Sequence, residues 1–453
     1  MPVTFTLGEL QARAGGVLCG VDAKTPVGPL TVDSREVAPG MLFCGLPGRY
    51  EHGRRHASAA VERGAAAVLL NPPEEAGLPC WVHEDPLEAM AEVGRMHLQT
   101  AGARVVGITG SVGKTSVKVL TAAVLRGRYH CEATPRNFNT QIGLPLALSA
   151  LDPGLDWFVA EMAMRGPGEI RALTAIAPPD VAVITNIGPA HLSELGTMEA
   201  ILEAKAEILE RLSVDGTAIL NGDDDRLRTL RDRAPGRVRW YGLKDADMCI
   251  RGVRSGAGFV EVDLADDSGR QTLRIPWDGA YQAHNIAAAA LVGRTLGLDW
   301  TEVQRGLATV REGTGHFRRI TVGSLTILDD TYNASPASMQ GGLLVLAAES
   351  GRRVALLGDM MELGPVTEEA HREAGRQAAV AADRILAVGS YAAWLAEEAR
   401  LAGANVEWVA DAAAAERWCR SELRAGDHLY VKASRAVELD ALVARLREWG
   451  GPS

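Results

Sequence analysis

Short apolar runs alternate with amphipathic stretches along most of the chain. Between residues 99 and 314 the runs predict buried strands at 104–108, 157–162, 181–186 and 217–220. The stretches between and after them have helical spacing and predict helices at 114–126, 198–212 and 282–296. Alternation of this kind predicts an α/β fold with a mostly parallel, doubly wound sheet.

The same alternation recurs on either side of this central part. The N-terminal part predicts strands at 30–32, 41–44 and 66–70, with a helix near 56–64. The C-terminal part predicts strands at 325–329, 353–357, 384–388, 406–409 and 428–431, and a last helix at 437–449. We therefore expect three domains: a smaller α/β domain at 1–98, the central domain at 99–314, and a Rossmann-like domain at 315–453.

Composition narrows the class of protein. A chain of 453 residues is long enough for about three domains of ordinary size. The 47 basic and 57 acidic residues give a net charge of −10, so we expect neither nucleic acid nor an anionic membrane as a partner. No apolar run is long enough to span a bilayer, and no signal peptide is evident. The six cysteines form no C-x-x-C pair, which favours the cytoplasm.

Lysine is scarce, because almost every basic residue is arginine. It occurs only at positions 24, 114, 118, 205, 244 and 432. Lys114, Lys205 and Lys432 fall inside the motifs described below, where an ammonium or a reactive amine is not replaceable by a guanidinium.

A glycine-rich turn follows the strand at 104–108 and precedes the helix at 114–126. Small residues let backbone N–H groups close around phosphate oxygens at a helix N-terminus, so the central sheet is predicted to be a P-loop sheet that binds ATP. Lys114 would reach the β- and γ-phosphates, and the Thr115 hydroxyl would bind Mg²⁺. The residues expected to contact the nucleotide here are Thr109, Gly110, Ser111, Val112, Gly113, Lys114, Thr115 and Ser116. The spacing departs from G-x-x-x-x-G-K-[ST], since Ile108 stands where the first glycine would be.

Two metal ligands are predicted at the same edge of the sheet. Glu161 ends the strand that begins at Trp157, and His191 follows the next strand. Because the carboxyl ends of parallel strands meet at one edge, both side chains would face the bound nucleotide. Together with Thr115 they are candidate Mg²⁺ ligands.

Lys205 lies within the apolar stripe of its helix. The apolar positions at 198, 201, 202, 208, 209 and 212 form one stripe at about 100° per residue. Desolvation there would lower the pKa of the amine. A neutral amine can capture CO₂ as a carbamate, which is a carboxylate-like metal ligand; the alternative is an ion-paired lysine.

These motifs together resemble the Mur ligase family, over a span from residue 33 to residue 435. The resemblance rests on the loop at 109–115 and on further segments at 33–35, 53–55, 134–145, 166–170, 204–207, 284–285, 314–319, 329–336, 358–364 and 432–435. It implies ATP, two Mg²⁺ ions and a carbamate on Lys205 that helps hold the second ion. It also implies catalytic roles for Lys114, His191, Lys205 and Arg319.

The resemblance further implies roles in substrate and nucleotide binding. Asn285, Asp330 and Arg319 would contact the nucleotide, with Arg319 preferred over Arg318 as the arginine directed at the phosphates. The expected substrate contacts are Ser34, Arg35, Asn137, Asn139, Tyr332 and Asn333. The chain departs from the family pattern at His52, Arg136, Thr140 and Ala433.

The segments D-D-T-Y-N-A-S-P at 329–336 and G-D-M-M-E-L-G at 358–364 are similar to one branch of the family. That branch joins D-alanyl-D-alanine to UDP-N-acetylmuramoyl-tripeptide through an acyl phosphate, in the cytoplasmic stage of peptidoglycan synthesis. The resemblance implies these two substrates as partners, and we expect a monomer. Two alternatives remain: a Mur-type ligase with another acceptor, and a non-catalytic nucleotide-binding relative.

Overall fold

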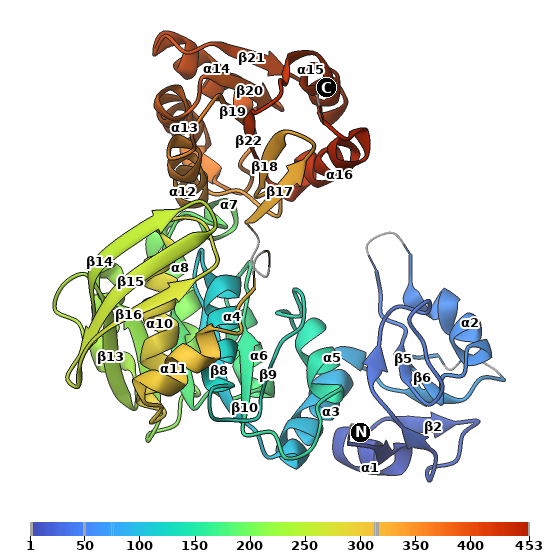
Figure 1. The fold of residues 1–453 in the computed structure, drawn as a ribbon. Coiled ribbons are helices and arrows are strands. Elements are labelled where there is room, and N and C mark those ends of the chain that lie inside the picture. The colour runs from blue at the N-terminus through green and yellow to red at the C-terminus, as the bar shows by residue number, and fades with distance from the viewer. Residues whose placement is uncertain are drawn as a thin grey trace.

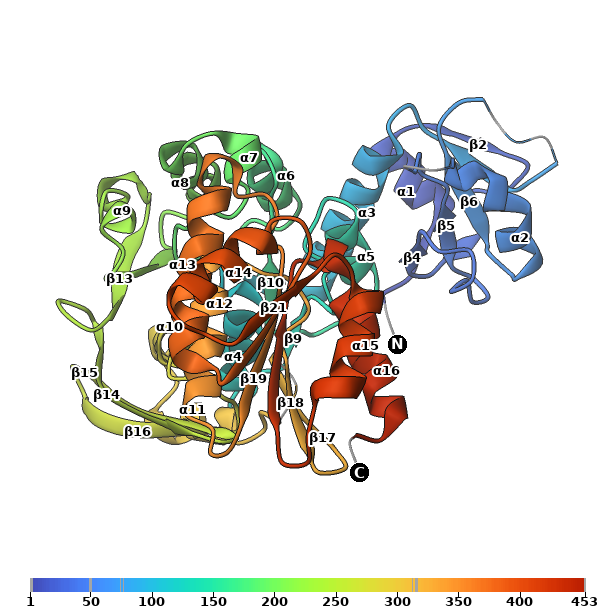
Figure 2. The ribbon, with the colours of Figure 1, turned by 90° about the horizontal axis from the view of Figure 1, so that it is seen from above.

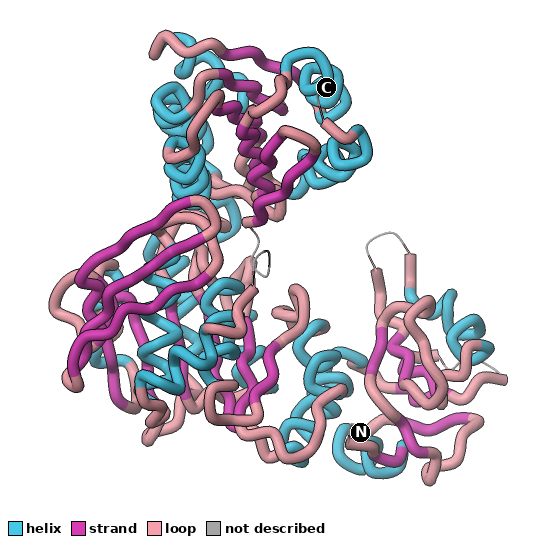
Figure 3. The backbone as a smooth tube through the Cα atoms, viewed as in Figure 1, coloured by secondary structure: helices cyan, strands magenta, loops and turns pink. Residues whose placement is uncertain are grey.

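Three α/β domains, each built on its own sheet, make up the protein. The structure, a computed structural model, describes residues 3–48, 51–73, 75, 77–311, 313 and 317–451. Figure 1 shows the central domain between the N-terminal and C-terminal domains, and Figure 3 shows strands and helices in all three. The predicted fold class is confirmed.

The central sheet has nine strands, and most of them are parallel. Their order is β16 (Gly269–Ile275), β15 (Phe259–Asp266), β14 (Met248–Gly256), β13 (Arg237–Gly242), β12 (Thr217–Asn221), β11 (Val181–Ile184), β8 (Arg104–Thr109), β10 (Trp157–Glu161) and β9 (Cys131–Ala133). Pairing is parallel from β9 to β14 and antiparallel between β14, β15 and β16. The antiparallel extension was not predicted from the sequence.

Helices cover both faces of this sheet, so it is doubly wound. One face packs against α4 (Lys114–Leu125), α10 (Gln282–Thr295) and α11 (Trp300–Leu307). The other packs against α5 (Gly143–Ser149), α6 (Glu169–Ile176) and α8 (Met198–Ala206). Because successive strand residues point to opposite faces, Val106 and Ile108 join the first core while Val105 joins the second.

Helix α8 is shorter than its apolar pattern predicts. It begins after the N-cap Thr197, whose side chain accepts a hydrogen bond from the Ala200 N–H. It gives way at Glu207 to the 3₁₀ turn η2 (Glu207–Leu209). The Glu207 carboxylate accepts hydrogen bonds from the Gly168 and Arg171 N–H groups at the start of α6. This contact ties the end of α8 to the neighbouring helix and satisfies N-terminal donors that α6 itself leaves open.

The C-terminal domain repeats the doubly wound arrangement on six strands. Their order is β17 (Arg318–Val322), β18 (Leu325–Asp329), β22 (His428–Lys432), β19 (Arg353–Gly358), β20 (Arg384–Val388) and β21 (Val406–Val409). Only β17 pairs antiparallel. Figure 2 shows α12 (Pro336–Ala347), α13 (Thr367–Ala381) and α14 (Ala392–Leu401) on one side of the sheet, and α15 (Ala412–Glu422) and α16 (Leu439–Trp449) on the other.

The N-terminal domain is the smallest of the three. Its five-stranded sheet has the order β2 (Val17–Cys19), β7 (Cys80–Val82), β6 (Ala67–Leu70), β5 (Leu42–Cys44) and β4 (Leu30–Thr31). A separate pair joins β1 (Phe5–Thr6) to β3 (Pro26–Val27), and the helices are α1 (Leu7–Ala14), α2 (Ala57–Glu62) and α3 (Pro86–Ala101). Helix α3 packs against α5 of the central domain and so joins the two.

Polar contacts on two sides of the junction connect the central and C-terminal domains. Arg319 of β17 forms an ion pair with Asp278, at 2.6 Å between Nη2 and Oδ1. On the other side of the junction, the loop after β19 meets α7 (Leu192–Leu195): the Ser193 N–H donates to the Glu362 carbonyl at 3.3 Å. Within the described ranges, no helix is both long enough and apolar enough to cross a membrane.

Candidate active site

The turn between β8 and α4 has a backbone that only glycine fits at two positions. Gly110 has φ +145°, and a Cβ there would lie 1.9 Å from Thr185 Oγ1. Gly113, the N-cap of α4, has φ +84°, and a Cβ there would lie 2.7 Å from Asn285 Oδ1. The neighbouring side chains therefore leave no space for a larger residue at either position.

A second loop holds this turn in place. The Ser111 N–H donates to the Asn186 carbonyl and the Val112 N–H to the Asn186 side-chain oxygen, each at 3.0 Å. Thr185 Oγ1 donates to the Val112 carbonyl at 2.6 Å. The turn is thus fixed before any ligand arrives, with a helix N-terminus behind it. Such a site suits an anion.

Lys114 is folded back over the same turn. Its Nζ donates to the Gly110 carbonyl at 2.7 Å and to the Ser111 carbonyl at 3.2 Å. Burial lowers the pKa of Lys114, and the Glu161 carboxylate opposes that shift. The ammonium therefore lies at the mouth of the anion site. Thr109 and Ser116 stand at the two ends of the turn, on β8 and in the first turn of α4.

The Glu161 side chain joins three segments of the central domain: α4, the Asn-rich loop at 134–145 and β10. Its carboxylate is 3% exposed. Oε2 accepts from Thr115 Oγ1 at 2.9 Å and lies 3.1 Å from Lys118 Nζ, and Oε1 accepts from Asn139 Nδ2 at 2.8 Å. Burial raises the pKa of Glu161, but Lys118, Lys114 and Asn139 outweigh it and bring the pKa below its usual value. The group is therefore a buried carboxylate that stays ionised.

His191 and Lys205 extend this charged region toward the C-terminal domain. His191 Nδ1 lies 2.6 Å from Glu362 Oε2, which comes from the loop after β19. Burial lowers the pKa of His191; Glu362 opposes the shift, and Lys205 and Lys114 add to it. The two lysines and the histidine are therefore close enough to influence one another.

Lys205 is buried on α8, as its position in the apolar stripe predicts. Its side chain is 2% exposed. In the described part of the chain no carboxylate forms an ion pair with it. Burial, with a smaller contribution from Lys114, lowers the pKa of Lys205 well below its usual value. The structure thus favours a neutral amine at this position.

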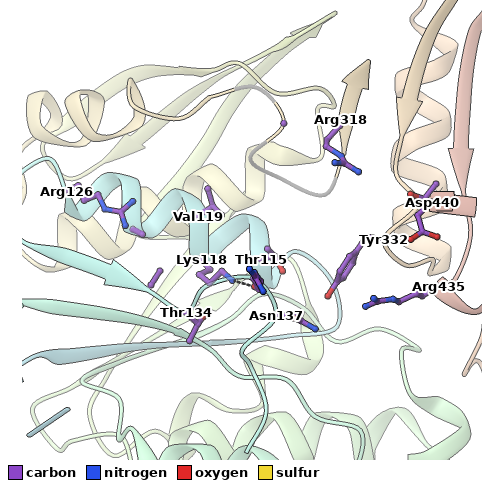
Figure 4. Close-up of a pocket in the computed structure, with 15 residues that line it drawn as sticks. Thr115, Lys118, Val119, Arg126, Thr134, Asn137, Arg318, Tyr332, Arg435 and Asp440 are labelled. Carbon is purple, nitrogen blue, oxygen red and sulfur yellow. Dashed lines mark hydrogen bonds between the residues drawn. The ribbon is translucent and has the colours of Figure 1, made fainter. Parts of the chain in front are cut away.

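A cavity of about 650 Å³ opens between the central and C-terminal domains beside Glu161. Figure 4 shows Thr115, Lys118 and Asn137 on one side of it, with Arg318, Tyr332 and Arg435 on the other. Arg126 and Arg136 also line the cavity, and Asp440 is the one carboxylate among the lining residues that the structure describes. The walls are therefore strongly cationic, which suits anionic ligands.

Several predicted site residues lie around this cavity or against the phosphate turn. Asn137 and Tyr332 line the cavity, and Asn139 holds Glu161. Asn285 donates to Gln282 Oε1 and directs its own Oδ1 toward Gly113. Their contacts to ligands stay predictions.

Arg319 lies elsewhere than predicted, and the structure favours Arg318 in its place. Arg319 forms ion pairs at 2.6 Å with both Asp278 and Glu349, and its side chain is 18% exposed. Neighbouring residues of a strand point to opposite sides, so Arg318 faces the cavity instead. Arg318 is half-exposed and pairs with Asp329 at 2.7 Å. The preceding segment Thr314–His316 lies outside the described residues.

Asp330 and Asn333 take part in the packing of the C-terminal domain. Lys432 Nζ donates to Asp330 Oδ2 at 2.6 Å and to the Asn333 carbonyl at 2.9 Å, and the Tyr430 hydroxyl donates to Asp330 at 3.3 Å. Burial raises the pKa of Asp330, and Lys432 opposes the shift. The structure thus gives both residues a clear role in positioning the 329–336 segment.

The predicted UDP-site residues Ser34 and Arg35 form an exposed turn of the N-terminal domain. Arg35 pairs with Asp33 at 2.6 Å. The neighbouring Glu36 lies 3.7 Å from Arg136 of the Asn-rich loop. The turn therefore lies beside the loop that carries Asn137 and Asn139. His52 caps the 3₁₀ turn η1 (Gly53–His56) by accepting from the Arg54 N–H.

Sequence reasoning missed two residues of this site, Lys118 and Glu362, and named Arg318 only as the alternative to Arg319. The scarcity of lysine was a usable signal for Lys118, because it is one of only six. Glu362 belongs to a recognised motif but had no partner until the fold brought it to His191. Within the described residues, no group of three or more His, Cys, Asp or Glu side chains is arranged to hold a metal ion.

Known proteins resemble this chain over nearly its whole length. The family model for the Mur ligase middle domain matches residues 108–293, and that for the Mur ligase glutamate ligase domain matches residues 316–435. The UDP-N-acetylmuramoyl-tripeptide–D-alanyl-D-alanine ligase of Synechocystis sp. is 35% identical, with 92% of this chain and 91% of that protein covered.

Solved structures agree with the sequence comparison. A crystal structure of MurF from Acinetobacter baumannii has a TM-score of 0.90 at 27% identity, with 99% of both chains covered. MurF from Thermotoga maritima, solved in complex with ADP, has a TM-score of 0.81 at 29% identity and covers 93% of this chain and 97% of its own. The phosphate turn and the buried Glu161 carboxylate agree with these relatives. The chain belongs to the Mur ligase family, and within it to the MurF group.

Proposed function

We propose that this protein joins D-alanyl-D-alanine to UDP-N-acetylmuramoyl-tripeptide in an ATP-dependent reaction of peptidoglycan synthesis. The observation that carries the proposal is the similarity, over 92% of the chain, to a relative named for that activity. The site supports it, because the phosphate turn, Lys114, Thr115 and Glu161 stand together beside a cationic cavity.

ATP is the proposed nucleotide, and the phosphate turn is its proposed site. The relative from Thermotoga maritima was solved with ADP. In this chain the backbone from Gly110 to Gly113 would surround the phosphates, and Lys114 would exchange its carbonyl partners for phosphate oxygens. Asn285, which abuts Gly113, would support the turn from behind.

Mg²⁺ is the proposed metal, and the donors at the site suit it. Thr115 Oγ1 and Glu161 Oε2 are oxygen donors 2.9 Å apart, and the pKa of Glu161 is low enough for it to stay ionised. His191 is the further candidate. Bound there, Mg²⁺ would neutralise the charge of the transferring phosphoryl group. We propose two such ions.

A carbamate on Lys205 is proposed as an additional oxygen donor. Burial lowers the pKa of the Lys205 amine well below its usual value, which favours the neutral form that adds to CO₂. The nitrogen forms a bond to carbon, one proton is released, and the product carries a negative charge. That charge would suit the pair of cations Lys114 and Mg²⁺ near it, whereas an ammonium would repel them.

The reaction we propose has two steps. The terminal carboxylate of the tripeptide attacks the γ-phosphorus of ATP, giving an acyl phosphate and ADP. The free amine of D-alanyl-D-alanine then attacks the acyl carbon, and phosphate leaves through a tetrahedral intermediate. Lys114 would stabilise the charge on the phosphoryl group, and Arg318 would do so from the C-terminal domain. Closure of that domain over the cavity would exclude water from the acyl phosphate.

The domain division, compartment and oligomeric state complete the proposal. We place the domains at 1–98, 99–314 and 315–453, with the first boundary best moved to the end of α3 at Ala101. We propose the cytoplasm as the compartment because ATP and UDP-linked precursors are cytoplasmic substrates. We propose a monomer because each domain has its own core within one chain. Nucleic acid and membranes are not proposed as partners, since the net charge is −10.

Phosphate release with a panel of substrates tests the proposal. The purified protein receives ATP and Mg²⁺ with each UDP-linked peptide precursor and each amine acceptor, alone and in pairs. We expect release only with UDP-N-acetylmuramoyl-tripeptide and D-alanyl-D-alanine together. Release with a different acceptor would assign a different ligase activity, and no release with any pair would favour a non-catalytic relative.

A further inference from the structure

Lys118 is a buried cation for which the proposed function has no task. It lies one turn after Lys114 on α4, and it is 4% exposed. Burying an ammonium is costly unless it is paired and hydrogen-bonded, so its partners indicate its role. It has two: Glu161 Oε2 at 3.1 Å, and the carbonyl of Arg136 at 2.9 Å.

The Arg136 carbonyl belongs to a strained turn. Arg136 has φ +47°, a conformation that residues other than glycine rarely adopt. The turn closes by a hydrogen bond from the Phe138 N–H to the Pro135 carbonyl at 3.0 Å, and the Arg136 side chain is exposed. A strained residue persists only where its surroundings hold it. Lys118 supplies that hold from the helix that carries the phosphate turn.

The residues after this turn are anchored independently. The Asn139 carbonyl accepts from the Ala163 N–H at 2.9 Å, and the Asn139 side chain donates to Glu161. Phe138 packs into the central and N-terminal cores. Residues 135–137, including the cavity-lining Asn137, therefore depend on Lys118 more than the following residues do.

We propose that Lys118 is a positioning residue that fixes the turn at 135–137 for binding of the UDP-linked substrate, and so connects that turn to the ATP-binding helix. It acts through the Arg136 carbonyl and touches neither reacting group. The role in substrate binding rests on the proposed function, whereas the structural link between α4 and the turn does not.

Two variants separate this role from simple charge compensation, because only one of them keeps the contact between Lys118 and Arg136. Lys118→Met alone would leave Glu161 buried and unpaired, which itself threatens folding. Glu161→Gln keeps the contact between Lys118 and the Arg136 carbonyl, whereas Lys118→Met combined with Glu161→Gln removes that contact without an unpaired charge. The informative comparison is between these last two proteins.

Hydrogen exchange of the free protein is the first readout. The Phe138 and Asn139 N–H groups donate to the Pro135 and Asn137 carbonyls and so report on the turn at 135–137. We expect these two amides to exchange about tenfold faster in the double variant than in Glu161→Gln, with the amides of β12 unchanged. Calorimetric titration with UDP-N-acetylmuramoyl-tripeptide, without nucleotide or metal, is the second. We expect the Kd to rise about tenfold or more in the double variant, and ADP to bind both proteins alike.

Arg126→Gln is the matched control. Arg126 lies at the C-terminal end of α4 and lines the same cavity as Lys118. Like Lys118 it donates to a backbone carbonyl, because its Nε donates to the Cys131 carbonyl at 3.0 Å. We expect it to leave the hydrogen exchange of Phe138 and Asn139 as in the wild type. An equal effect from Arg126→Gln would overturn the proposal in favour of a general effect of positive charge.

Two further results would contradict the proposal. If Lys118 only balances the charge of Glu161, the double variant will match Glu161→Gln in both readouts. If exchange of the turn changes but substrate affinity does not, the link exists without a role in binding. A wild-type protein that fails to bind the UDP-linked substrate would refute the proposed function instead, and the exchange comparison would still decide the link.

Discussion

Replacing Arg319 with glutamine should cost stability, whereas replacing its neighbour Arg318 should cost catalysis. Arg319 connects the C-terminal domain to Asp278 of the central domain, and it separates Asp278 from Glu349. Burial lowers the pKa of Arg319, but the two carboxylates outweigh burial and raise the pKa above its usual value. It therefore carries a full positive charge between two nearly buried carboxylates.

The size of the effect follows from what the substitution leaves behind. Asp278 and Glu349 are each 7% exposed, and Arg319→Gln would leave both without their shared cation. Breaking a buried pair in this way costs about 3–5 kcal/mol. For a domain of this size that corresponds to a fall in melting temperature of roughly 10 °C or more. Arg318 is half-exposed, but its partner Asp329 is only 2% exposed. Asp329 keeps two hydrogen bonds from Thr331, so the loss of Arg318 should cost less than the loss of Arg319, about 1–3 kcal/mol.

Calorimetric unfolding and steady-state kinetics, measured on both variants, test this reasoning. We expect Arg319→Gln to lower the unfolding temperature while the folded protein keeps much of its kcat. We expect Arg318→Gln to lose less stability than Arg319→Gln and to lose kcat by a factor of about 100, as for removal of one positioned electrostatic group. An Arg319→Gln protein of unchanged stability that has lost turnover would refute the assignment and restore Arg319 as the catalytic arginine.

Three further predictions concern single residues. Gly110→Ala should weaken ADP binding by a factor of about 100 or more in calorimetric titration, because the added Cβ would lie 1.9 Å from Thr185 Oγ1. Binding within threefold of wild type would contradict the close approach of Thr185 to this turn. Lys205→Ala should abolish turnover and recover part of it with added short carboxylates, if a carbamate acts there; full activity without them would remove that role. Burial lowers the pKa of His371, whose neutral ring bonds to the Met360 N–H and the Thr367 carbonyl. On acidification the unfolded chain therefore takes up a proton at a higher pH than the folded protein does. The free energy of unfolding should fall as the pH drops below about 6.5. The difference in unfolding free energy between wild type and His371→Asn should therefore shrink between pH 7.5 and pH 5.5, and a constant difference would contradict it.

Most parallel strands of the fold could be predicted from the sequence because they are continuous buried runs. The parallel strands β9 and β13 are only partly buried and were not predicted. The strands at 104–109 and 353–358 are apolar on both faces, as sheets covered by helices require. The strands of the antiparallel extension escaped prediction for the opposite reason. Residues 248–256 mix exposed and buried positions and contain Arg251 and Arg254, so no clear apolar run marks them.

The site could be predicted where one segment carries its own signal. The phosphate turn is local, and Lys205 stands out within one helical stripe. Contacts between distant segments left no such signal. Arg319 meets Asp278 from 41 residues away, and His191 meets Glu362 from the other domain, so only the fold could distinguish Arg319 from Arg318 or give Glu362 a partner.

Transfer of oxygen from the tripeptide to phosphate tests the central claim most directly. The terminal carboxylate of UDP-N-acetylmuramoyl-tripeptide is labelled with ¹⁸O and incubated with ATP, Mg²⁺, D-alanyl-D-alanine and the protein. The proposed acyl phosphate requires one labelled oxygen in each phosphate released, together with an equal amount of the pentapeptide product by mass spectrometry. Unlabelled phosphate, or label without pentapeptide, would contradict the account.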